Sequence, residues 1–225
     1  MKVRQLHRWD VTPGEARQIQ LELHGQVVLL DLVSRIRWVA GADCAFDLRR
    51  GRAFAGVIVY SFPHMVEIER FSATRALTFP YVPGLLSFRE APVLLEAFAQ
   101  LRHAPDVVFV DGQGYAHPRR FGIACHLGVL LGKATVGCAK SRLIGAHAEP
   151  CREAGSWAPL LHAGETIGAV LRTRRGVKPI FVSAGHRVSL ARAIELTLAV
   201  CDGYRIPRPT RDADHYVRRI KNAGR

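Results

Sequence analysis

The sequence lacks long apolar runs. No stretch of the 225 residues approaches the roughly 18 to 20 consecutive apolar residues that a membrane helix needs. The N-terminus, MKVRQLHRWD, has no apolar core of the kind found in signal peptides. These absences predict a cytoplasmic protein with no membrane partner.

Cysteine pairs at metal-binding or redox spacing are also missing. The five cysteines form no CxxC motif and have no pair of histidines at zinc-finger spacing beside them. We therefore expect reduced, mostly buried thiols rather than disulfides or a structural metal site, at Cys44, Cys125, Cys138, Cys151 and Cys201.

Acidic residues are few relative to basic ones. Lys and Arg number 32 against 19 Asp and Glu, which gives a net charge of +13. A positive field of this size favours a polyanionic partner such as nucleic acid, although solubility alone could also explain it. With 48% hydrophobic residues, the chain is long enough for one substantial core, and we expect a single domain over residues 1–225.

One of the few acids follows a buried strand. Val107 to Val110 are apolar, and Asp111 comes next, at the start of a glycine turn formed by Gly112-Gln113-Gly114. Burying an unpaired carboxylate costs several kcal/mol or more, roughly, so a cation, a metal or a helix N-terminus is expected beside it. The alternative is that Asp111 only caps its own turn.

A second acid lies within a predicted strand, Arg37 to Phe46. Strand alternation places Asp43 on one face with Val39 and Gly41. Two further strands, residues 53–61 and 65–71, follow after short turns and predict an antiparallel meander. Asp43 could also be a strand-end acid that faces solvent.

Two more acids are expected on helices. Glu90 shares the apolar stripe of a helix predicted over Ser87 to Leu101, where interaction with the helix dipole is an alternative role. A last helix, capped by Thr210, carries Asp214 at the edge of its stripe, whereas His215 points nearly away. Converging carboxylates repel one another unless divalent cations intervene, and hard oxygen ligands favour Mg²⁺ or Mn²⁺. Such a site in a basic protein is typical of phosphodiester hydrolysis.

The remaining patterns predict helices, strands and loops, some of which also have a possible functional role. Pro80 and Pro83 stiffen a loop with Tyr81 and Val82 at its tip, either an ordinary braced loop or a wedge that enters a stacked duplex. Lys140 follows a short buried strand, either as a solvated strand end or as a cation that stays charged beside a phosphate or carboxylate cluster. Residues 151–161 are expected to be an irregular surface segment. Other expected elements are a helix starting at Thr12-Pro13, a helix through residues 123–131, a hairpin of residues 167–173 and 178–183, and a helix starting at Ser189 and reaching Cys201.

Six segments together resemble the motifs of the endonuclease V family. They are VAGADCAF, PYVPGLLSFRE, FVDGQGYAHPRRFGIACHLGVLLG, VGCAKSRL, KPIFVSAGHRVSL and YRIPRPTRDAD, in order and over most of the chain. The resemblance implies an RNase H-like fold, with a central mixed sheet flanked by helices. It also implies Mg²⁺-dependent DNA repair, in which the strand is nicked at the second phosphodiester bond 3′ to deoxyinosine, leaving 3′-hydroxyl and 5′-phosphate ends.

The resemblance also implies residue roles. Asp43, Glu90, Asp111 and Asp214 would be metal ligands, with His215 as an alternative to Asp214, and Lys140 would help to hold the attacking water and the phosphate. The family's strand-separating wedge corresponds to Pro80, Tyr81, Val82 and Pro83. The pocket for the altered base would involve Gly84, Leu85, Gly112, His117 and Ile123, while Gln113 and Tyr115 receive no role.

Two functional alternatives stay open on the sequence alone. An inosine-specific endoribonuclease would use the same scaffold, because contacts to a 2′-hydroxyl cannot be read from these motifs. A nucleic-acid-binding module without turnover is a second alternative, although all four acids are present. The expected partner is DNA containing deoxyinosine, or inosine-containing RNA, and no obligate protein partner is inferred.

Overall fold

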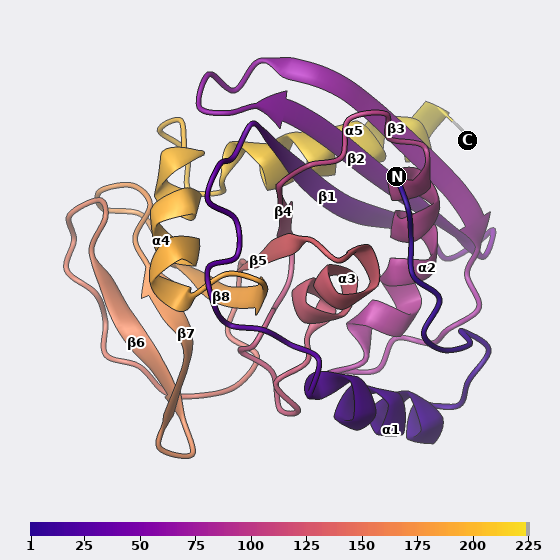
Figure 1. Cartoon of the computed structure of the whole chain (residues 1–225), viewed down its shortest axis with the longest axis horizontal. Coiled ribbons are helices and arrows are strands. Elements are labelled where there is room, and N and C mark those ends of the chain that lie inside the picture. Colours follow the sequence, from indigo (N-terminus) through magenta and orange to yellow (C-terminus); the bar gives the residue numbers. More distant parts are fainter. Residues whose placement is uncertain (224–225) are drawn as a thin grey trace.

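The computed structural model describes residues 1–223, in which eight strands form one sheet in the order β3-β2-β1-β4-β5-β8-β7-β6 (Figure 1). The strands are β1 (Trp38–Asp47), β2 (Arg52–Ser61), β3 (Glu67–Ala76), β4 (Val107–Val110), β5 (Ala134–Ala139), β6 (Trp157–His162), β7 (Glu165–Leu171) and β8 (Ile180–His186). The helices are α1 (Pro13–His24), α2 (Leu86–Ala99), α3 (Ile123–Leu131), α4 (Leu190–Ala199) and α5 (Arg208–Ala223).

The sheet is mixed. Strands β1, β4 and β5 run parallel to one another at its centre. The predicted meander of β1, β2 and β3 is antiparallel and is confirmed. Strands β5, β8, β7 and β6 form a second antiparallel run on the other side. The carboxyl ends of the three parallel strands therefore meet at one edge of the sheet, where Asp111 and Lys140 follow β4 and β5.

Helices cover both faces of the sheet. Alternate residues of β1, β2 and β4 pack against α2 and α3 in one apolar cluster. The intervening residues, with those of β5, β7 and β8, form a second cluster with α4 and with Tyr216 of α5. Because both faces are covered, all four residues of β4 are buried, as its continuous apolar sequence predicts.

Three details of the sequence prediction were wrong. The segment 151–161, expected to be irregular, contains the start of β6, which pairs with β7. Helix α5 begins at Arg208, so Thr210 lies in its first turn and donates to the carbonyl oxygen of Pro207 at 3.1 Å instead of capping it. Helix α4 ends at Ala199, before Cys201, and Ser189 does cap it as predicted.

All five cysteines are free thiols, as expected. Only Cys125 and Cys138 are fully buried, however, and Cys151 is exposed. Within residues 1–223, no helix has both the length and the apolar character needed to cross a bilayer.

Candidate functional site

The register of the parallel strands brings two of the predicted acids together. Ala42 of β1 pairs with Val110 of β4, so Asp43 and Asp111 are the next residues along two neighbouring strands. Adjacent strands lie about 4.8 Å apart, and the Asp111 N–H donates to the carbonyl oxygen of Ala42 at 3.4 Å. Two acids that are 68 residues apart in the sequence therefore lie side by side.

Glu90 reaches the same place from α2. Its side chain is 9% exposed, and the Cys44 thiol donates to its backbone carbonyl oxygen at 3.9 Å. The charges of Asp43 and Asp111 both act on its carboxyl group. The core-facing position predicted from the helical stripe is therefore confirmed for this side chain.

Asp214 approaches from α5, which packs directly onto β1 and β2. Two glycines allow this contact: a Cβ at Gly41 would lie 1.9 Å from the carbonyl oxygen of Pro209, and one at Gly56 would lie 3.0 Å from the ring of Tyr216. Asp214 is 18% exposed and pairs with Arg218 at 2.9 Å. Its charge acts on Asp43 and on Lys140.

His215 points elsewhere, as its place on the helix predicts. It is exposed and lines a separate surface cleft of about 420 Å³ together with Tyr60, Glu67 and Asp212. The structure thus places Asp214, and not its neighbour, near Asp43 and Lys140.

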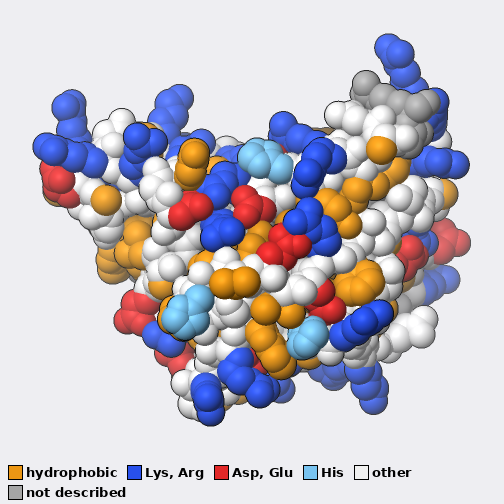
Figure 2. Space-filling view, turned by 90° about the horizontal axis from the view of Figure 1, so that it is seen from above, with side chains coloured by type: hydrophobic (Ala, Val, Ile, Leu, Met, Phe, Trp, Pro, Cys, Tyr) orange, Lys and Arg blue, Asp and Glu red, His pale blue; other side chains and the backbone are white. Residues whose placement is uncertain are grey.

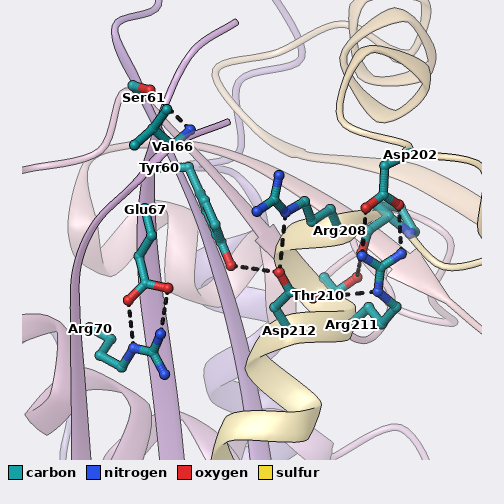
Figure 3. A network of polar contacts seen from close by, with 11 residues as sticks. Tyr60, Ser61, Val66, Glu67, Arg70, Asp202, Arg208, Thr210, Arg211 and Asp212 are labelled. Carbon is teal, nitrogen blue, oxygen red and sulfur yellow. Dashed lines mark hydrogen bonds and ion pairs between the residues drawn. The ribbon is translucent and has the colours of Figure 1, made fainter. Parts of the chain in front are cut away.

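A polar network holds the first turns of α5 in place (Figure 3). The Tyr60 hydroxyl of β2 donates to Asp212 at 2.9 Å. Arg211 makes two bonds of 2.6 Å to the carboxylate of Asp202, and Arg208 also contacts Asp212, at 3.3 Å. This network fixes the rotation of the helix one turn before Asp214.

Burial and mutual repulsion make ionisation of the carboxylates costly. Burial and the nearby charge of Asp111 raise the pKa of Asp43 to about 8. Burial, followed by the charges of Asp43 and Asp111, raises the pKa of Glu90 well above its usual range. Both shifts report negative charge that lacks sufficient compensation within the protein.

Lys140 is the cation that the structure places in this cluster. Its ammonium forms an ion pair with Asp111. Burial lowers the pKa of Lys140, but the hydrogen bond to Asp111 and the nearby acids outweigh this, and the net shift is upward. Lys140 therefore stays charged beside the carboxylates, as predicted from its position after β5.

The chemistry of this donor set fits a hard divalent cation. All four acids supply carboxylate oxygens, which Mg²⁺ and Mn²⁺ prefer, and the raised pKa values show a need for added positive charge. Within the described part of the chain, however, no three His, Cys, Asp or Glu side chains are grouped closely enough to hold one ion. Asp111 contacts the Lys140 ammonium instead.

A cavity of about 330 Å³ opens beside the carboxylates. Helices α2 and α3 both begin at its wall, and neither N-terminus has a side-chain cap. The N–H groups of Phe88 and Ala124 already donate to backbone carbonyl oxygens, so only the other first-turn N–H groups could meet a ligand. Of the predicted wedge and pocket residues, those lining it are Tyr81, Val82, Pro83, Gly84, Gly112, His117 and Ile123. Pro80 is exposed next to it, whereas the Leu85 side chain is buried in an apolar cluster with Phe79 and Phe88.

The turn after the wedge is clamped through one carbonyl group. The Gly84 oxygen accepts from Gln20 Nε2 at 3.1 Å, His117 Nε2 at 2.9 Å and an Arg119 guanidinium nitrogen at 2.7 Å. Burial lowers the pKa of His117 to about 4, so its ring is neutral and its Nε2–H donates. Tyr81 remains 70% exposed at the tip of the loop.

A second groove, of about 880 Å³, meets the cavity at Lys140, which lines both. Its walls include Arg152 and Lys178, both exposed, and Arg205. Arg205 holds the backbone at Lys140 through a bond of 2.8 Å to its carbonyl oxygen. Elsewhere on the surface, Lys and Arg side chains surround the face shown in Figure 2, and acids lie among basic residues near its centre.

Sequence reasoning missed several groups around the cavity. Gln20 on α1 is 1% exposed. The sequence signal that could have identified it is an amide side chain on the apolar stripe of a helix. Gln113, which had no predicted role, donates from Nε2 to the carbonyl oxygen of Ser141 at 2.9 Å. Ser87 and His126 form a buried pair at 3.0 Å, which no local pattern indicates because 39 residues separate them.

Comparisons with known proteins agree with this arrangement. The profile of the Endonuclease V family matches residues 21–215. Endonuclease V of Nostoc sp. (strain PCC 7120) is 51% identical over 215 residues, covering 95% of this chain and 97% of the relative. That of Roseiflexus castenholzii is 50% identical over 208 residues, covering 92% and 93%.

Solved structures show the same fold. Endonuclease V of Streptomyces avermitilis has a TM-score of 0.92 at 43% identity and covers 100% of both chains. Ciona intestinalis Endonuclease V, in complex with a 24mer DNA containing an inosine followed by a ribo-adenosine, has a TM-score of 0.83 at 27% identity, covering 94% of this chain and 98% of the other. These neighbours share the RNase H-like fold, and the predicted fold class is confirmed.

Proposed function

Because this chain belongs to the endonuclease V family, we propose that it is a Mg²⁺-dependent DNA repair endonuclease. It nicks the second phosphodiester bond 3′ to deoxyinosine and leaves 3′-hydroxyl and 5′-phosphate ends. Mn²⁺ can replace Mg²⁺, since both take hard oxygen ligands. The protein acts as a single domain over residues 1–225, in the cytoplasm, without an obligate protein partner.

The observation that carries the proposal is the pairing of Asp43 and Asp111 on adjacent parallel strands, with Lys140 beside them and a base-sized cavity adjoining. Asp43, Glu90, Asp111 and Asp214 would hold the cation. A bound divalent ion supplies polarisation of the phosphate and a lowered pKa for a water molecule. Asp43 and Glu90 would hold the ion in their deprotonated forms, and the charge of Lys140 beside Asp111 would remain in the site.

Lys140 acts on the nucleic acid. Its ammonium provides positive charge for a phosphate oxygen at the mouth of the cavity. The bond from Arg205 to the Lys140 carbonyl oxygen and the bond from Gln113 to the Ser141 carbonyl oxygen fix the backbone at this lysine and at the residue that follows it. The lysine is thus positioned before the substrate binds.

The cavity would receive the altered base. Its volume of about 330 Å³ suits one purine, and the uncapped starts of α2 and α3 offer N–H groups to a carbonyl such as O6 of hypoxanthine. The exposed ring of Tyr81, on a turn clamped at Gly84, would fill the gap left in the duplex. The strand 3′ to the lesion would pass Lys140 into the basic groove of Arg152 and Lys178.

An inosine-specific endoribonuclease is the alternative function. It is favoured by one observation, the inosine followed by a ribo-adenosine in the complex of the Ciona relative. A non-catalytic binding module is a weaker alternative, because all four acids and Lys140 are present.

One assay tests the proposal. Labelled strands with a single inosine, as DNA and as RNA, are incubated with and without Mg²⁺, and the cut is mapped. We expect a metal-dependent nick in the DNA at the second bond 3′ to inosine. Nicking without metal, or of RNA alone, would contradict the proposal.

A further inference from the structure

The basic groove beside Lys140 is built around a buried arginine. Arg172 follows the last residue of β7 and is 6% exposed. It lines the groove of about 880 Å³. Burial of a charged side chain is costly unless hydrogen bonds satisfy it, so the contacts of Arg172 show what its burial serves.

The Arg172 guanidinium holds two loops together. In the loop before β6, it donates to the carbonyl oxygens of Cys151 at 2.7 Å and Pro150 at 3.0 Å and to the carboxylate of Glu149 at 2.6 Å. In the loop between β7 and β8, it donates to the carbonyl oxygen of Val177. A guanidinium can join these groups because its N–H donors form a rigid planar fork, which a lysine ammonium lacks.

Two of these carbonyl groups come directly before the exposed cations of the groove. Cys151 precedes Arg152, and Val177 precedes Lys178. The Arg152 carbonyl oxygen also accepts from the Gly176 N–H at 3.1 Å, which joins the two loops directly. One guanidinium therefore fixes the backbones of two cations that lie on different loops.

The two loops are of a kind that is costly to order. Most of their residues are exposed, and each has a glycine at positive φ, Gly155 at 86° and Gly176 at 72°. Glycine loses the most conformational freedom when a chain becomes ordered. If a nucleic acid had to order the loops on binding, that cost would weaken its affinity. The bonds of Arg172 order them in advance.

We propose that Arg172 is a positioning residue for the nucleic acid strand 3′ to the cut, acting through Arg152 and Lys178. Arg172 does not touch the strand itself, because its side chain is buried and bonded to protein groups. The inference rests on the proposed function, in which the strand leaves the cavity past Lys140. It adds a substrate requirement, a 3′ segment long enough to fill the groove.

Truncation of the strand tests this requirement. Labelled single strands carry one inosine and either about three or about twelve nucleotides 3′ to it, and kcat and KM for nicking are measured for each. In the wild-type protein, KM should be about tenfold lower for the long strand, because more phosphates contact the groove, and kcat should be similar.

Substitution of Arg172 separates its position from its charge. Arg172→Gln should reduce the tenfold ratio to about twofold by raising KM for the long strand alone. Arg172→Lys keeps the charge but loses the fork, so it should behave like Arg172→Gln. A wild-type ratio in folded Arg172→Gln, or its return in Arg172→Lys, would overturn the inference.

A matched control lies at the opposite end of β8. Arg187 follows that strand, and its guanidinium donates to the Gly132 carbonyl oxygen at 2.9 Å. Arg187→Gln removes the same charge and a bond between two segments but leaves the groove intact, so the ratio should stay tenfold. An equal loss in Arg187→Gln would overturn the assignment to Arg172.

Hydrogen exchange tests the preformed groove in the wild-type protein without nucleic acid, and so does not depend on how well the variants fold. The Gly176 N–H should exchange at least about a hundredfold more slowly than in an unstructured chain, because it donates to Arg152. Exchange at the unstructured rate would overturn the inference.

Failure of the inference can be told apart from failure of the proposed function. A wild-type protein that nicks inosine strands of both lengths with the same KM overturns the inference while the proposed function stands. A protein that leaves both strands uncut overturns the proposed function and the inference with it.

Discussion

The cavity and the carboxylate cluster share one edge of the sheet but differ in how their polar groups are satisfied. Around the cavity, the Gly84 carbonyl has three donors, and burial keeps the imidazoles of His117 and His126 neutral. In the cluster, Asp43 and Glu90 are held beside other negative charges with raised pKa values. The loop at Gly84 is therefore satisfied within the protein, although Oε1 of Gln113 in the cavity wall is buried without a hydrogen-bond partner, whereas the cluster lacks positive charge.

In the proposed function, the cavity selects the base and the carboxylate cluster carries out the phosphodiester chemistry. A rigid cavity discriminates between bases because its donors and acceptors cannot rearrange to suit the wrong one. The cluster, in contrast, holds carboxylates that repel one another, and in the proposed function a divalent cation would relieve this repulsion and make nicking dependent on the ion. Substitutions in one region should leave the other largely unaffected.

The largest effect is expected for Asp111→Asn. It removes one of the two side-by-side carboxylates and the partner of Lys140, so nicking of inosine strands should fall by about a thousandfold or more. Binding of the inosine strand should be retained, because the cavity is intact. The control is Asp106→Asn at the opposite end of β4, where an amide oxygen can still accept the N–H groups of Arg37 and Trp38; equal loss in both variants would refute the assignment.

The second prediction concerns stability without metal. Because the pKa of Asp43 rises from 3.8 to about 8 on folding, the folded state binds more protons between these values, and its stability should fall as pH rises through that window. Asp43→Asn should flatten this dependence and stabilise the metal-free protein at pH 8, by on the order of 2 to 4 kcal/mol. Urea unfolding at several pH values measures both effects.

A carboxylate whose pKa is shifted in the opposite direction provides the control for that experiment. The hydrogen bonds from Arg211 lower the pKa of Asp202, so the stability it contributes is present at neutral pH and is lost on acidification. Asp202→Asn should therefore destabilise the protein at pH 8. If both variants destabilised it equally, Asp43 would not carry an uncompensated charge.

Sequence patterns singled out the four acids and Lys140 as candidates because each depends on local position, and the family resemblance assigned their roles. Asp43 and Asp111 follow from strand alternation and from a strand end, and Glu90 follows from a helical stripe. The order of the strands in the sheet could not be predicted from the sequence. It is the pairing of β1 with β4 that brings Asp43 beside Asp111. The capping role predicted for Thr210 failed because the chain turns into α5 two residues earlier.

The rest of the cavity could not be predicted because its contacts cross long distances in the sequence. Gln20 meets Gly84 across 64 residues, and His7 meets His126 across 119. A polar residue on an apolar stripe shows that a partner must exist, but only the fold identifies the partner. The strand β6 was missed for a different reason. Its burial alternates, but its exposed positions include the apolar Trp157 and Leu161, so apolar and polar residue types do not alternate in the sequence.

A smaller effect is expected for Gln20→Leu. The change removes one donor from Gly84, removes the Gln20 donor from the Phe121 carbonyl oxygen, and removes the acceptor of Arg119 Nε, while the other Arg119 bond to Gly84 stays. Preference for inosine over undamaged strands should fall about three- to tenfold, with metal binding unchanged. Gln18→Leu, at an exposed position of the same helix, is the control, and a similar loss there would return Gln20 to a purely structural role.

The smallest effect is expected in the basic groove. Lys178→Gln should weaken DNA binding a few-fold and reduce the slope of log affinity against log salt by about one, because one phosphate contact is lost. Arg102→Gln removes the same charge at an exposed site before β4, away from the groove. An unchanged slope in Lys178→Gln would exclude this lysine from the strand path.

The central claim is that the buried carboxylates bind a divalent cation. Calorimetric titration with Mn²⁺, in buffers of different ionisation enthalpy, tests it most directly. At pH 7 the proton on Asp43 must leave before the ion binds, so binding should release about one proton or more per ion, and affinity should rise about tenfold per pH unit below 8. Asp43→Asn should bind weakly and release fewer protons. Tight binding without proton release, unchanged in Asp43→Asn, would contradict the account.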